Sequence, residues 1–185
     1  KDADMTKLMD GVIWVSGGFY GGCLITEDHT LYVWDDTSDS LRTVCNDVRW
    51  AEGNLLITLD NQLYRFRRTE SEQFDDYQFD LLLTDVKRVA SSLPRALGVI
   101  RQDDSLWVLK RLYGEDGTST LAPAEKFMDD VADTATTYQR TIILKTDGTV
   151  LLCENADGYY AFREEDYDAP RSTGIVCRMW SEDSP

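Results

Sequence analysis

The residues of this chain that could do chemistry are acidic side chains, four cysteines and one histidine. Nucleophilic catalysis by serine or cysteine needs a neighbouring base, most often a histidine that a third group orients. His29 is the only histidine, and it lies between Asp28 and Thr30 in a segment with the composition of a surface turn. The sequence also lacks a phosphate-binding glycine loop and the H-E-x-x-H zinc motif. We therefore expect no enzyme activity, no metal site and no cofactor.

Acidic residues form three clusters, at Asp75-Asp76, Asp129-Asp130 and Glu164-Glu165-Asp166. Such clusters can hold calcium or supply the paired carboxylates of a glycosidase. The run from Asp35 to Asp39 is the nearest to a calcium loop, but it lacks the glycine and the terminal glutamate of an EF-hand. We interpret these acids as solvated loop residues, and a glycoside-processing enzyme is the least favoured of three functional hypotheses.

The four cysteines, Cys23, Cys45, Cys153 and Cys177, include no C-x-x-C pair. A chain of 185 residues can bury a hydrophobic core without support from disulfides or zinc. Cys23 and Cys153 fall in or beside apolar, strand-like runs, so we expect buried free thiols at these two positions.

The charge of the chain argues against two classes of partner. The 19 basic and 34 acidic residues give a net charge of −15, which repels phosphate backbones and anionic lipid heads. No apolar run reaches the ~18 residues of a membrane span, and no signal-peptide pattern is present. We expect a soluble domain that does not bind nucleic acid or insert into membranes. The sequence begins at Lys1, as a segment processed or excised from a longer chain would.

One short pattern recurs four times along the chain. It is an aliphatic residue, two variable positions, an aspartate, two more positions, and an aliphatic residue that an aromatic usually follows; the aspartates are Asp28, Asp60, Asp103 and Asp147. The pairs Asp-His, Asp-Asn, Asp-Asp and Asp-Gly tolerate the positive φ angles of a type I′ turn. Each copy therefore predicts a β-hairpin with a two-residue connection, in which the aspartate forms the turn rather than acting as a ligand or an acid.

A second element, an aspartate or glycine followed by an aliphatic residue, precedes each hairpin. It occurs at Gly11-Val12, Asp47-Val48, Asp85-Val86, Asp130-Val131 and Gly174-Ile175, with spacings of 36, 38, 45 and 44 residues. Units of this size are typical of propeller blades. The sequence predicts one all-β domain or segment over 1–185, a propeller-like array of four repeats with the start of a fifth. The repeats are approximately 6–42, 43–80, 81–125, 126–170 and a partial 171–185, the second being shortened before its turn aspartate.

These repeats resemble those of the regulator of chromosome condensation family of β-propellers. Val12-Ile13-Trp14-Val15-Ser16-Gly17-Gly18 followed by Leu31-Tyr32-Val33-Trp34 is the best copy of the family pattern, and Thr146-Asp147-Gly148-Thr149-Val150 is another. The phrase from Pro123 to Val131 is similar to repeats of bacterial secreted propellers of the beta-lactamase inhibitory protein II type. A histidine common in the family is missing, and Asp35 replaces the glycine after tryptophan. The resemblance implies the fold and an extracellular or cell-surface location in a bacterium, but not the family's exchange-factor or chromatin functions.

Propellers bind their partners through loops on two faces. We expect short loops near Phe19-Tyr20, Leu93-Pro94 and Tyr138-Gln139 on one face, and longer links at 35–42, 67–77, 110–123 and 155–170 on the other. The candidate binding residues lie in the longer links and are Phe74, Asp75, Asp76, Tyr77, Tyr113, Tyr159 and Tyr160. Aromatic rings supply rigid contact area, and neighbouring carboxylates steer a basic partner.

These features predict a non-catalytic scaffold whose function is binding to a protein partner or self-association. Carbohydrate recognition through stacking on exposed rings is the alternative. A competing interpretation places the same aromatic residues in the outermost strands, where they pack against neighbouring parts of a blade. Trp14, Trp34, Trp50 and Trp107 occur at strand positions and are assigned to the core.

Overall fold

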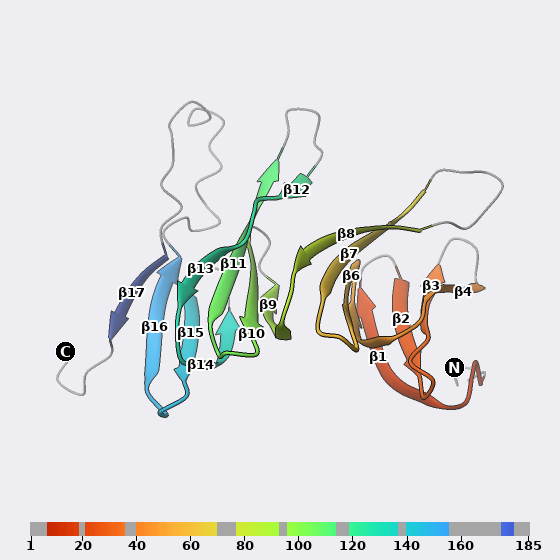
Figure 1. The fold of residues 1–185 in the computed structure, drawn as a ribbon, viewed down its shortest axis with the longest axis horizontal. Coiled ribbons are helices and arrows are strands. Elements are labelled where there is room, and N and C mark those ends of the chain that lie inside the picture. The colour runs from red at the N-terminus through yellow and green to blue at the C-terminus, as the bar shows by residue number, and fades with distance from the viewer. Residues whose placement is uncertain are drawn as a thin grey trace, which may run out of the picture. The chain divides into compact units, whose positions relative to one another are not determined.

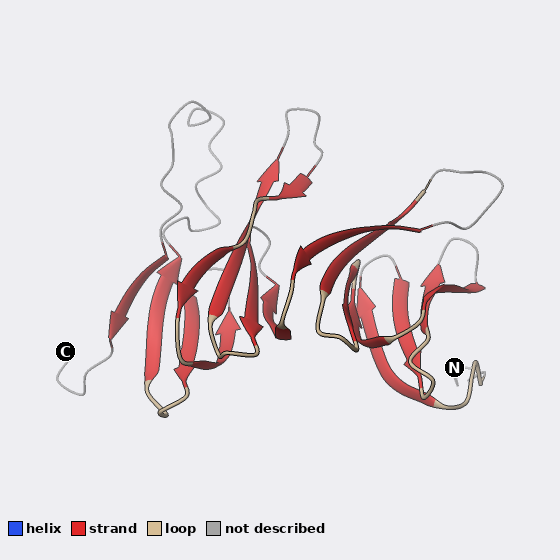
Figure 2. Ribbon diagram, viewed as in Figure 1, coloured by secondary structure: helices blue, strands red, loops and turns tan. Residues whose placement is uncertain are grey.

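The computed structural model describes residues 7–18, 21–35, 40–69, 77–92, 96–113, 119–136, 140–155 and 175–179. Within these residues all regular secondary structure is β-strand, as Figure 2 shows. The described part of the chain contains no helix able to cross a membrane. The chain divides into two compact units, Lys1–Asp85 and Val86–Pro185, and each contains two antiparallel sheets (Figure 1). The predicted all-β fold class is confirmed.

The first unit contains two four-stranded sheets whose strands follow one another in chain order. The first sheet consists of β1 (Val12–Gly18), β2 (Gly21–Thr26), β3 (Leu31–Asp35) and β4 (Ser40–Cys45). The second consists of β5 (Val48–Glu52), β6 (Leu55–Thr58), β7 (Leu63–Arg68) and β8 (Tyr77–Leu83). Strand β5 lies against β1 and β2, so the two sheets of this unit meet at their first strands. Four antiparallel strands in chain order are the architecture of a propeller blade.

The second unit repeats this plan. Its first sheet consists of β9 (Val86–Ser92), β10 (Ala96–Arg101), β11 (Leu106–Tyr113) and β13 (Glu125–Met128), with β12 (Ser119–Leu121) paired to the far end of β11. Its second sheet consists of β14 (Val131–Thr136), β15 (Arg140–Lys145), β16 (Val150–Asn155) and β17 (Ile175–Met179). Strand β14 lies against β9 and β10. The second unit therefore joins its sheets at their first strands as the first unit does.

The segment Ile175–Met179 has a different place from the one that its sequence pattern indicates. Gly174-Ile175 matches the start of a repeat, but β17 pairs with β16 and is the fourth strand of its sheet. It therefore corresponds to β4, β8 and β13. Each of the four sheets begins just after Gly11, Asp47, Asp85 or Asp130. The first three sheets end at Cys45, Leu83 and Met128, a few residues beyond the repeat boundaries drawn from the sequence, and the fourth ends at Met179, in the segment assigned to a fifth repeat.

All four hairpins share a turn that differs from the predicted type I′ turn. In the first, the carbonyl of Thr26 accepts from the amide of His29 at 2.8 Å, and the amide of Thr26 donates to the carbonyl of Thr30 at 3.1 Å. The same pair of bonds recurs at Thr58, Arg101 and Lys145. The third loop residue alone is left-handed, with φ of 63° at His29, 65° at Asn61, 60° at Asp104 and 89° at Gly148. The connection is thus a three-residue loop, in which a left-handed residue follows a type I turn.

The turn aspartates accept hydrogen bonds inside their own loops, which confirms that they form the turns. Oδ1 of Asp28 accepts from the Thr26 hydroxyl at 2.5 Å and from the Thr30 amide at 3.3 Å. Oδ1 of Asp103 accepts from the Ser105 hydroxyl at 2.5 Å and from the Ser105 amide at 3.1 Å. These bonds hold the loop in the one conformation that places the next residue in the left-handed region.

Hydrogen bonding to the carboxylate lowers the pKa of three turn aspartates. The Thr26 hydroxyl is the main cause at Asp28, and the hydroxyl of Ser105 is the main cause at Asp103. At Asp147 the main cause is the amide of Thr149, which donates to Oδ1 at 2.8 Å. Because the folded state favours the charged form, ionisation of these aspartates adds to the stability of the turns, and protonation removes that contribution.

Left-handed residues also join the two sheets of a unit. The carbonyl of His29 accepts from the amide of Val48, the first residue of β5, at 3.0 Å. In the second unit the carbonyl of Asp104 accepts from the amide of Val131, the first residue of β14, at 2.7 Å. The residue before each first strand is left-handed as well, as at Asp47 with a φ of 61°. The two recurring sequence signals, the hairpin aspartate and the Asp-Val pair, therefore mark the two ends of one backbone junction.

Each unit has an apolar core to which both of its sheets contribute. In the first unit a core cluster is formed by the buried residues Cys23, Ile25, Leu31, Val48, Ala51, Leu56 and Phe66. In the second unit the corresponding cluster is formed by Ile100, Leu106, Val131, Ile143 and Leu151. The predicted buried thiol at Cys23 is confirmed, and burial raises its pKa. The prediction for Trp14 is wrong: it is 37% exposed, and its indole N–H donates to the Ala51 carbonyl at 2.8 Å, across the junction between β1 and β5.

Replacing Gly21 with alanine should destabilise the first unit strongly. Gly21 has a φ of 135°, and a Cβ there would lie 2.2 Å from the carbonyl oxygen of Trp34 on the paired strand β3. Because the clash is with backbone, we expect Gly21→Ala to lower the free energy of unfolding by about 2–4 kcal/mol in urea titrations. Gly17→Ala is the matched control, since nothing lies within 4 Å of its Cβ position. Equal effects of the two changes would contradict this account.

Acid should weaken the hairpin turns. Since the folded-state pKa values of Asp28, Asp103 and Asp147 are lowered, their stabilising contribution is present above the unfolded pKa and is lost as the pH falls through and below about 4. The triple variant Asp28→Asn/Asp103→Asn/Asp147→Asn keeps the acceptor oxygens but cannot titrate. We expect its melting temperature to fall less than that of the wild type between pH 5 and pH 2.5.

A charge-matched triple variant, Asp10→Asn/Glu27→Gln/Asp47→Asn, removes the same number of carboxylates from exposed positions. If both triple variants flatten the acid dependence equally, net charge rather than turn geometry causes the acid lability.

Candidate interaction surface

Because neighbouring strands run in opposite directions, the strand ends of every sheet lie along two opposite sides. We call each of these rows of strand ends an edge, which is not to be confused with the outermost strand of the sheet. In the first sheet, β1 ends and β2 begins at the same edge as β3 ends and β4 begins, which we call the loop edge. The β2–β3 hairpin and the link to β5 lie at the opposite edge, which we call the turn edge. The other sheets follow the same rule. The expectation that short loops and long links occupy opposite faces is therefore wrong, because both leave the sheets from the loop edge.

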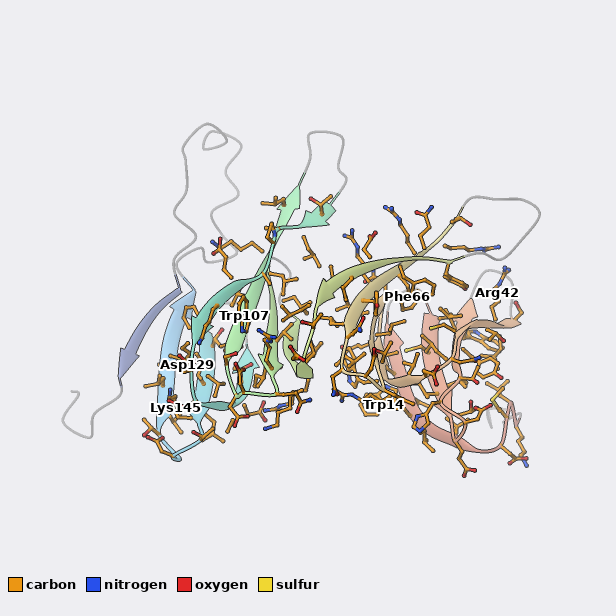
Figure 3. All side chains as sticks on the ribbon, viewed as in Figure 1. Trp14, Arg42, Phe66, Trp107, Asp129 and Lys145 are labelled. Atoms are coloured by element: carbon orange, nitrogen blue, oxygen red, sulfur yellow. The ribbon has the colours of Figure 1, made fainter. Side chains whose placement is uncertain are left out.

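The turn edge carries acidic residues that already have partners. In the second unit, the carboxylate of Asp129 lies 2.6 Å from Nζ of Lys126, and that of Asp130 lies 3.7 Å from Nζ of Lys145. Lys145 also donates to the backbone carbonyl of Asp129, and Figure 3 shows these two residues together near the β15–β16 hairpin. Within the described residues, no group of three His, Cys, Asp or Glu side chains could hold a metal ion. The Asp129-Asp130 cluster thus pairs with lysines.

Asp104, another aspartate of the turn edge, forms an ion pair with Lys87 of the same sheet. Oδ1 of Asp104 lies 2.7 Å from Nζ of Lys87, at the start of β9. Asp104 is also the left-handed residue whose carbonyl accepts from Val131. Exposed pairs of this kind contribute roughly 0–1 kcal/mol each, so they orient the turns more than they stabilise the fold. The described residues of the turn edge therefore make ion pairs within a sheet and backbone hydrogen bonds between sheets.

The loop edge is shortened in the second sheet. Strands β5 and β6 are joined there by the two residues Gly53-Asn54, with a φ of 59° at Gly53. The sequence prediction that the second repeat is short before its turn aspartate is confirmed. Glu52, Gly53 and Asn54 are exposed. The connection in this sheet therefore presents only a small surface, and the larger segment at this edge is the one between β7 and β8.

Tyr77 is the candidate binding residue whose side chain the structure describes. It begins β8 at the loop edge, opposite Arg68 of β7. Its ring meets that of Phe66 edge-on, with centroids 5.9 Å apart and planes at 70°. Tyr77 packs against the core of the first unit and is half-buried, whereas Phe66, labelled in Figure 3, is 5% exposed. These contacts favour the packing interpretation for Tyr77, which directly follows the 70–76 segment in the sequence.

The remaining candidates are placed only by their strands. Tyr113 is the last residue of β11, and its backbone pairs with Ser119 at the start of β12. Phe74, Asp75, Asp76, Tyr159 and Tyr160 lie outside the described residues. The segments that contain them start from Arg68–Thr69 after β7 and from Asn155 at the end of β16, which are both positions at the loop edge.

Sequence reasoning missed polar and apolar residues of β7 and β8 that flank Tyr77. Nη2 of Arg65 lies 2.9 Å from Oδ2 of Asp80, and Nε of Arg67 donates to Oε1 of Gln78 at 3.1 Å. On the same strand Phe79 is 41% exposed and Leu81 is 52% exposed. The available signal was the strict alternation of Tyr77, Phe79 and Leu81 with Gln78 and Asp80, which is typical of a strand with one polar face.

The fold defined by these sheets is that of the RCC1-like β-propellers, and the predicted resemblance is confirmed at the level of fold. Prp20p from Saccharomyces cerevisiae, described with its binding properties to Gsp1p and histones, superposes with a TM-score of 0.59 at 12% identity, over 83% of this chain and 48% of that chain. Yeast RCC1 (Prp20) bound to Kap60 gives 0.57 at 12% identity, over 83% and 46%. Human WBSCR16 gives 0.55 at 15% identity, over 82% and 50%.

The chain therefore spans about half the length of these structures. No protein-family model and no curated protein matches the sequence. The particular likeness to bacterial propellers of the beta-lactamase inhibitory protein II type stays a prediction.

Replacing Tyr77 should show how much its ring contributes to the stability of the first unit. Tyr77→Ala removes the edge-on contact with Phe66 and half-buried apolar area, so we expect a loss of about 1.5–3 kcal/mol in the free energy of unfolding. Tyr77→Phe keeps the ring and should cost less than about 1 kcal/mol. Phe79→Ala, on the same strand but 41% exposed, is the control and should cost less than Tyr77→Ala. A Tyr77→Ala variant as stable as wild type would show that the ring does not support the core.

Proposed function

We propose that this chain is a non-catalytic scaffold that binds a basic protein partner through the loop edges of its sheets. The observation that carries the proposal is that the turn edges make the contacts between sheets, whereas the long segments start from the loop edges. The turn edges are engaged in the His29–Val48 and Asp104–Val131 backbone junctions and in lysine–aspartate pairs. All of the long segments start from the loop edges, where their sequences can vary without disturbing these junctions.

The partners of proteins with this fold support a protein as ligand. Prp20p is described by its binding to Gsp1p and histones, and yeast RCC1 (Prp20) is found bound to Kap60. The likeness covers about half of those chains, so the identity of this chain's partner does not follow from them.

The charge of the chain supports a basic partner. The net charge of −15 creates a field that accelerates encounters with cationic proteins. On β7 and β8, which flank the 70–76 segment in the sequence, Arg65 and Arg67 are engaged with Asp80 and Gln78. Asp75 and Asp76 in that segment, together with the run Glu164-Glu165-Asp166, would then provide negative charge beside Phe74, Tyr159 and Tyr160.

Two further elements belong to this proposal. The repeats act together as one binding domain, and the domain works outside a bacterial cell or at its surface, as the likeness of Pro123–Val131 to secreted propellers implies. Self-association is a second form of protein binding, which light scattering of the purified chain would reveal.

Peptide binding tests the proposal directly. The purified chain is titrated with fluorescent peptides of equal length and graded charge, and we expect measurable affinity for basic peptides that weakens as salt rises. Asp75→Asn/Asp76→Asn should weaken binding by about 5–10-fold, and Tyr159→Ala/Tyr160→Ala by a similar factor. Glu27→Gln/Asp47→Asn removes the same charge from the turn edge and should change affinity less than about 2-fold.

Affinity that is independent of peptide charge, or an equal loss in the turn-edge control, would refute the proposal. Binding to a glycan array that is lost in Tyr159→Ala/Tyr160→Ala would support carbohydrate recognition instead.

A further inference from the structure

Two cysteines lie directly opposite each other in the last sheet of the second unit. Strands β16 and β17 pair antiparallel, with Leu151 opposite Met179 and Asn155 opposite Ile175. In the middle of this register Cys153 is opposite Cys177. In Figure 1 the two strands run side by side. Residues directly opposite in an antiparallel pair belong to the same face of the sheet.

Backbone spacing at such a pair suits a disulfide. Directly opposite residues have Cα atoms about 4.5 Å apart at a non-hydrogen-bonded position and about 5.5 Å apart at a hydrogen-bonded one. Disulfide-bonded cysteines have Cα separations of roughly 4.4–6.8 Å. Both kinds of antiparallel position fall within this range, so the backbone register of Cys153 and Cys177 is compatible with a disulfide between them.

The other two cysteines provide a contrast within the same protein. Cys23 lies on β2 and Cys45 on β4, and β3 separates these strands. Two strand spacings amount to roughly 9.5 Å, which is beyond the reach of a disulfide. Cys23 and Cys45 are free thiols. The fold therefore keeps one pair of its four cysteines apart and places the other pair in register.

The first-unit thiols are also poor nucleophiles. Burial, helped by the charge of Asp47, raises the pKa of Cys45 to about 11, and burial raises the pKa of Cys23. Because the thiolate is the reactive form, neither thiol competes well for an oxidant near neutral pH.

We propose that Cys153 and Cys177 form a reversible cross-strand disulfide that fastens β17 to β16. The oxidant is a low-molecular-weight disulfide such as oxidised glutathione. The thiolate of one cysteine attacks a glutathione sulfur, the glutathione disulfide bond breaks, and a mixed disulfide forms as one glutathione thiolate leaves. The second cysteine then attacks the protein sulfur of the mixed disulfide and releases the other glutathione. Two protein thiols are oxidised, one glutathione disulfide is reduced to two thiols, and the two protons pass to the released glutathione.

The disulfide would fasten β17, the last strand of its sheet. Strand β17 is at the end of the strand order β14-β15-β16-β17 and pairs with β16 alone among the described strands. A cross-link in the middle of the pair prevents β17 from leaving the sheet and closes the chain between residues 153 and 177 into a loop. That loop contains Tyr159 and Tyr160, so any effect of the bond on partner binding rests on the proposed function, whereas the bond itself does not.

Peptide mapping under defined redox conditions tests the proposal. The full chain is equilibrated with mixtures of oxidised and reduced glutathione, its thiols are blocked, and it is digested with trypsin without reduction. Oxidation should produce a linked species made of peptides 146–163 and 172–178, which contain Cys153 and Cys177. The thiol count in denaturant should fall from four to two per chain, and addition of reductant should restore it.

Thermal melting gives a second readout. The oxidised chain should melt on the order of 5–10 °C above the reduced chain. Cys177→Ser should abolish both the linked peptides and the redox dependence of the melting temperature. Cys45→Ser should leave both unchanged, and the reduced wild type shows how the fold behaves without the bond.

Four free thiols in strongly oxidising glutathione, or linked peptides that contain Cys23 or Cys45 instead, would overturn the proposal. Failure of peptide binding with the disulfide present would refute the proposed function and leave the bond standing.

Discussion

In each unit a backbone hydrogen bond, donated by the amide of the first residue of the second sheet, links the two sheets beside their shared apolar core. Val48 and Val131 are fully buried, and their amides donate to the carbonyls of His29 and Asp104. A buried amide without a partner costs about 1–3 kcal/mol, so the acceptor has to be in place. It is in place because the residue that carries it adopts a positive φ, which histidine, asparagine and aspartate tolerate better than most residues. Turn chemistry, sheet placement and core closure are therefore coupled at this bond.

Much of the fold is predictable because its signals are local. Alternating apolar residues around an aspartate locate each hairpin, and the spacing of the Asp-Val pairs gives the size of each sheet. The turn type is wrong because a pair such as Asp28-His29 fits either turn, and only the position of the positive φ distinguishes them. Ile175–Met179 is placed differently because Gly174-Ile175 matches the start of a repeat, whereas pairing with β16 decides its position. The sequence assigns Trp14 to the core because its ring is largely apolar. Its indole N–H needs an acceptor, however, and the Ala51 carbonyl at the junction between the sheets provides it.

The candidate site is less predictable than the fold. Aromatic and acidic residues can be found in a sequence, but the edge from which they project depends on strand direction, which loop length does not reveal. Tyr77 illustrates the problem, since its contact with Phe66 comes from the pairing of β7 and β8. The alternation in β8 predicts a strand with one polar face, but the exposure of Phe79 and Leu81 and the pairing of Arg65 with Asp80 follow from the alignment of the strands. The register of Cys153 and Cys177 is likewise a property of pairing and not of spacing along the chain.

The junction between sheets is made by main-chain atoms, and this affects how such proteins can diverge. A junction made by backbone amides and carbonyls places few demands on side-chain identity. It needs a residue able to adopt the left-handed conformation and a small aliphatic residue at the start of the next sheet. Most other positions can drift while the geometry of the repeat persists. The chain shares its fold with Prp20p and WBSCR16 at only 12% and 15% identity, which agrees with low demands on side-chain identity. Proteins with this fold are thus better compared through backbone conformation than through residue matches.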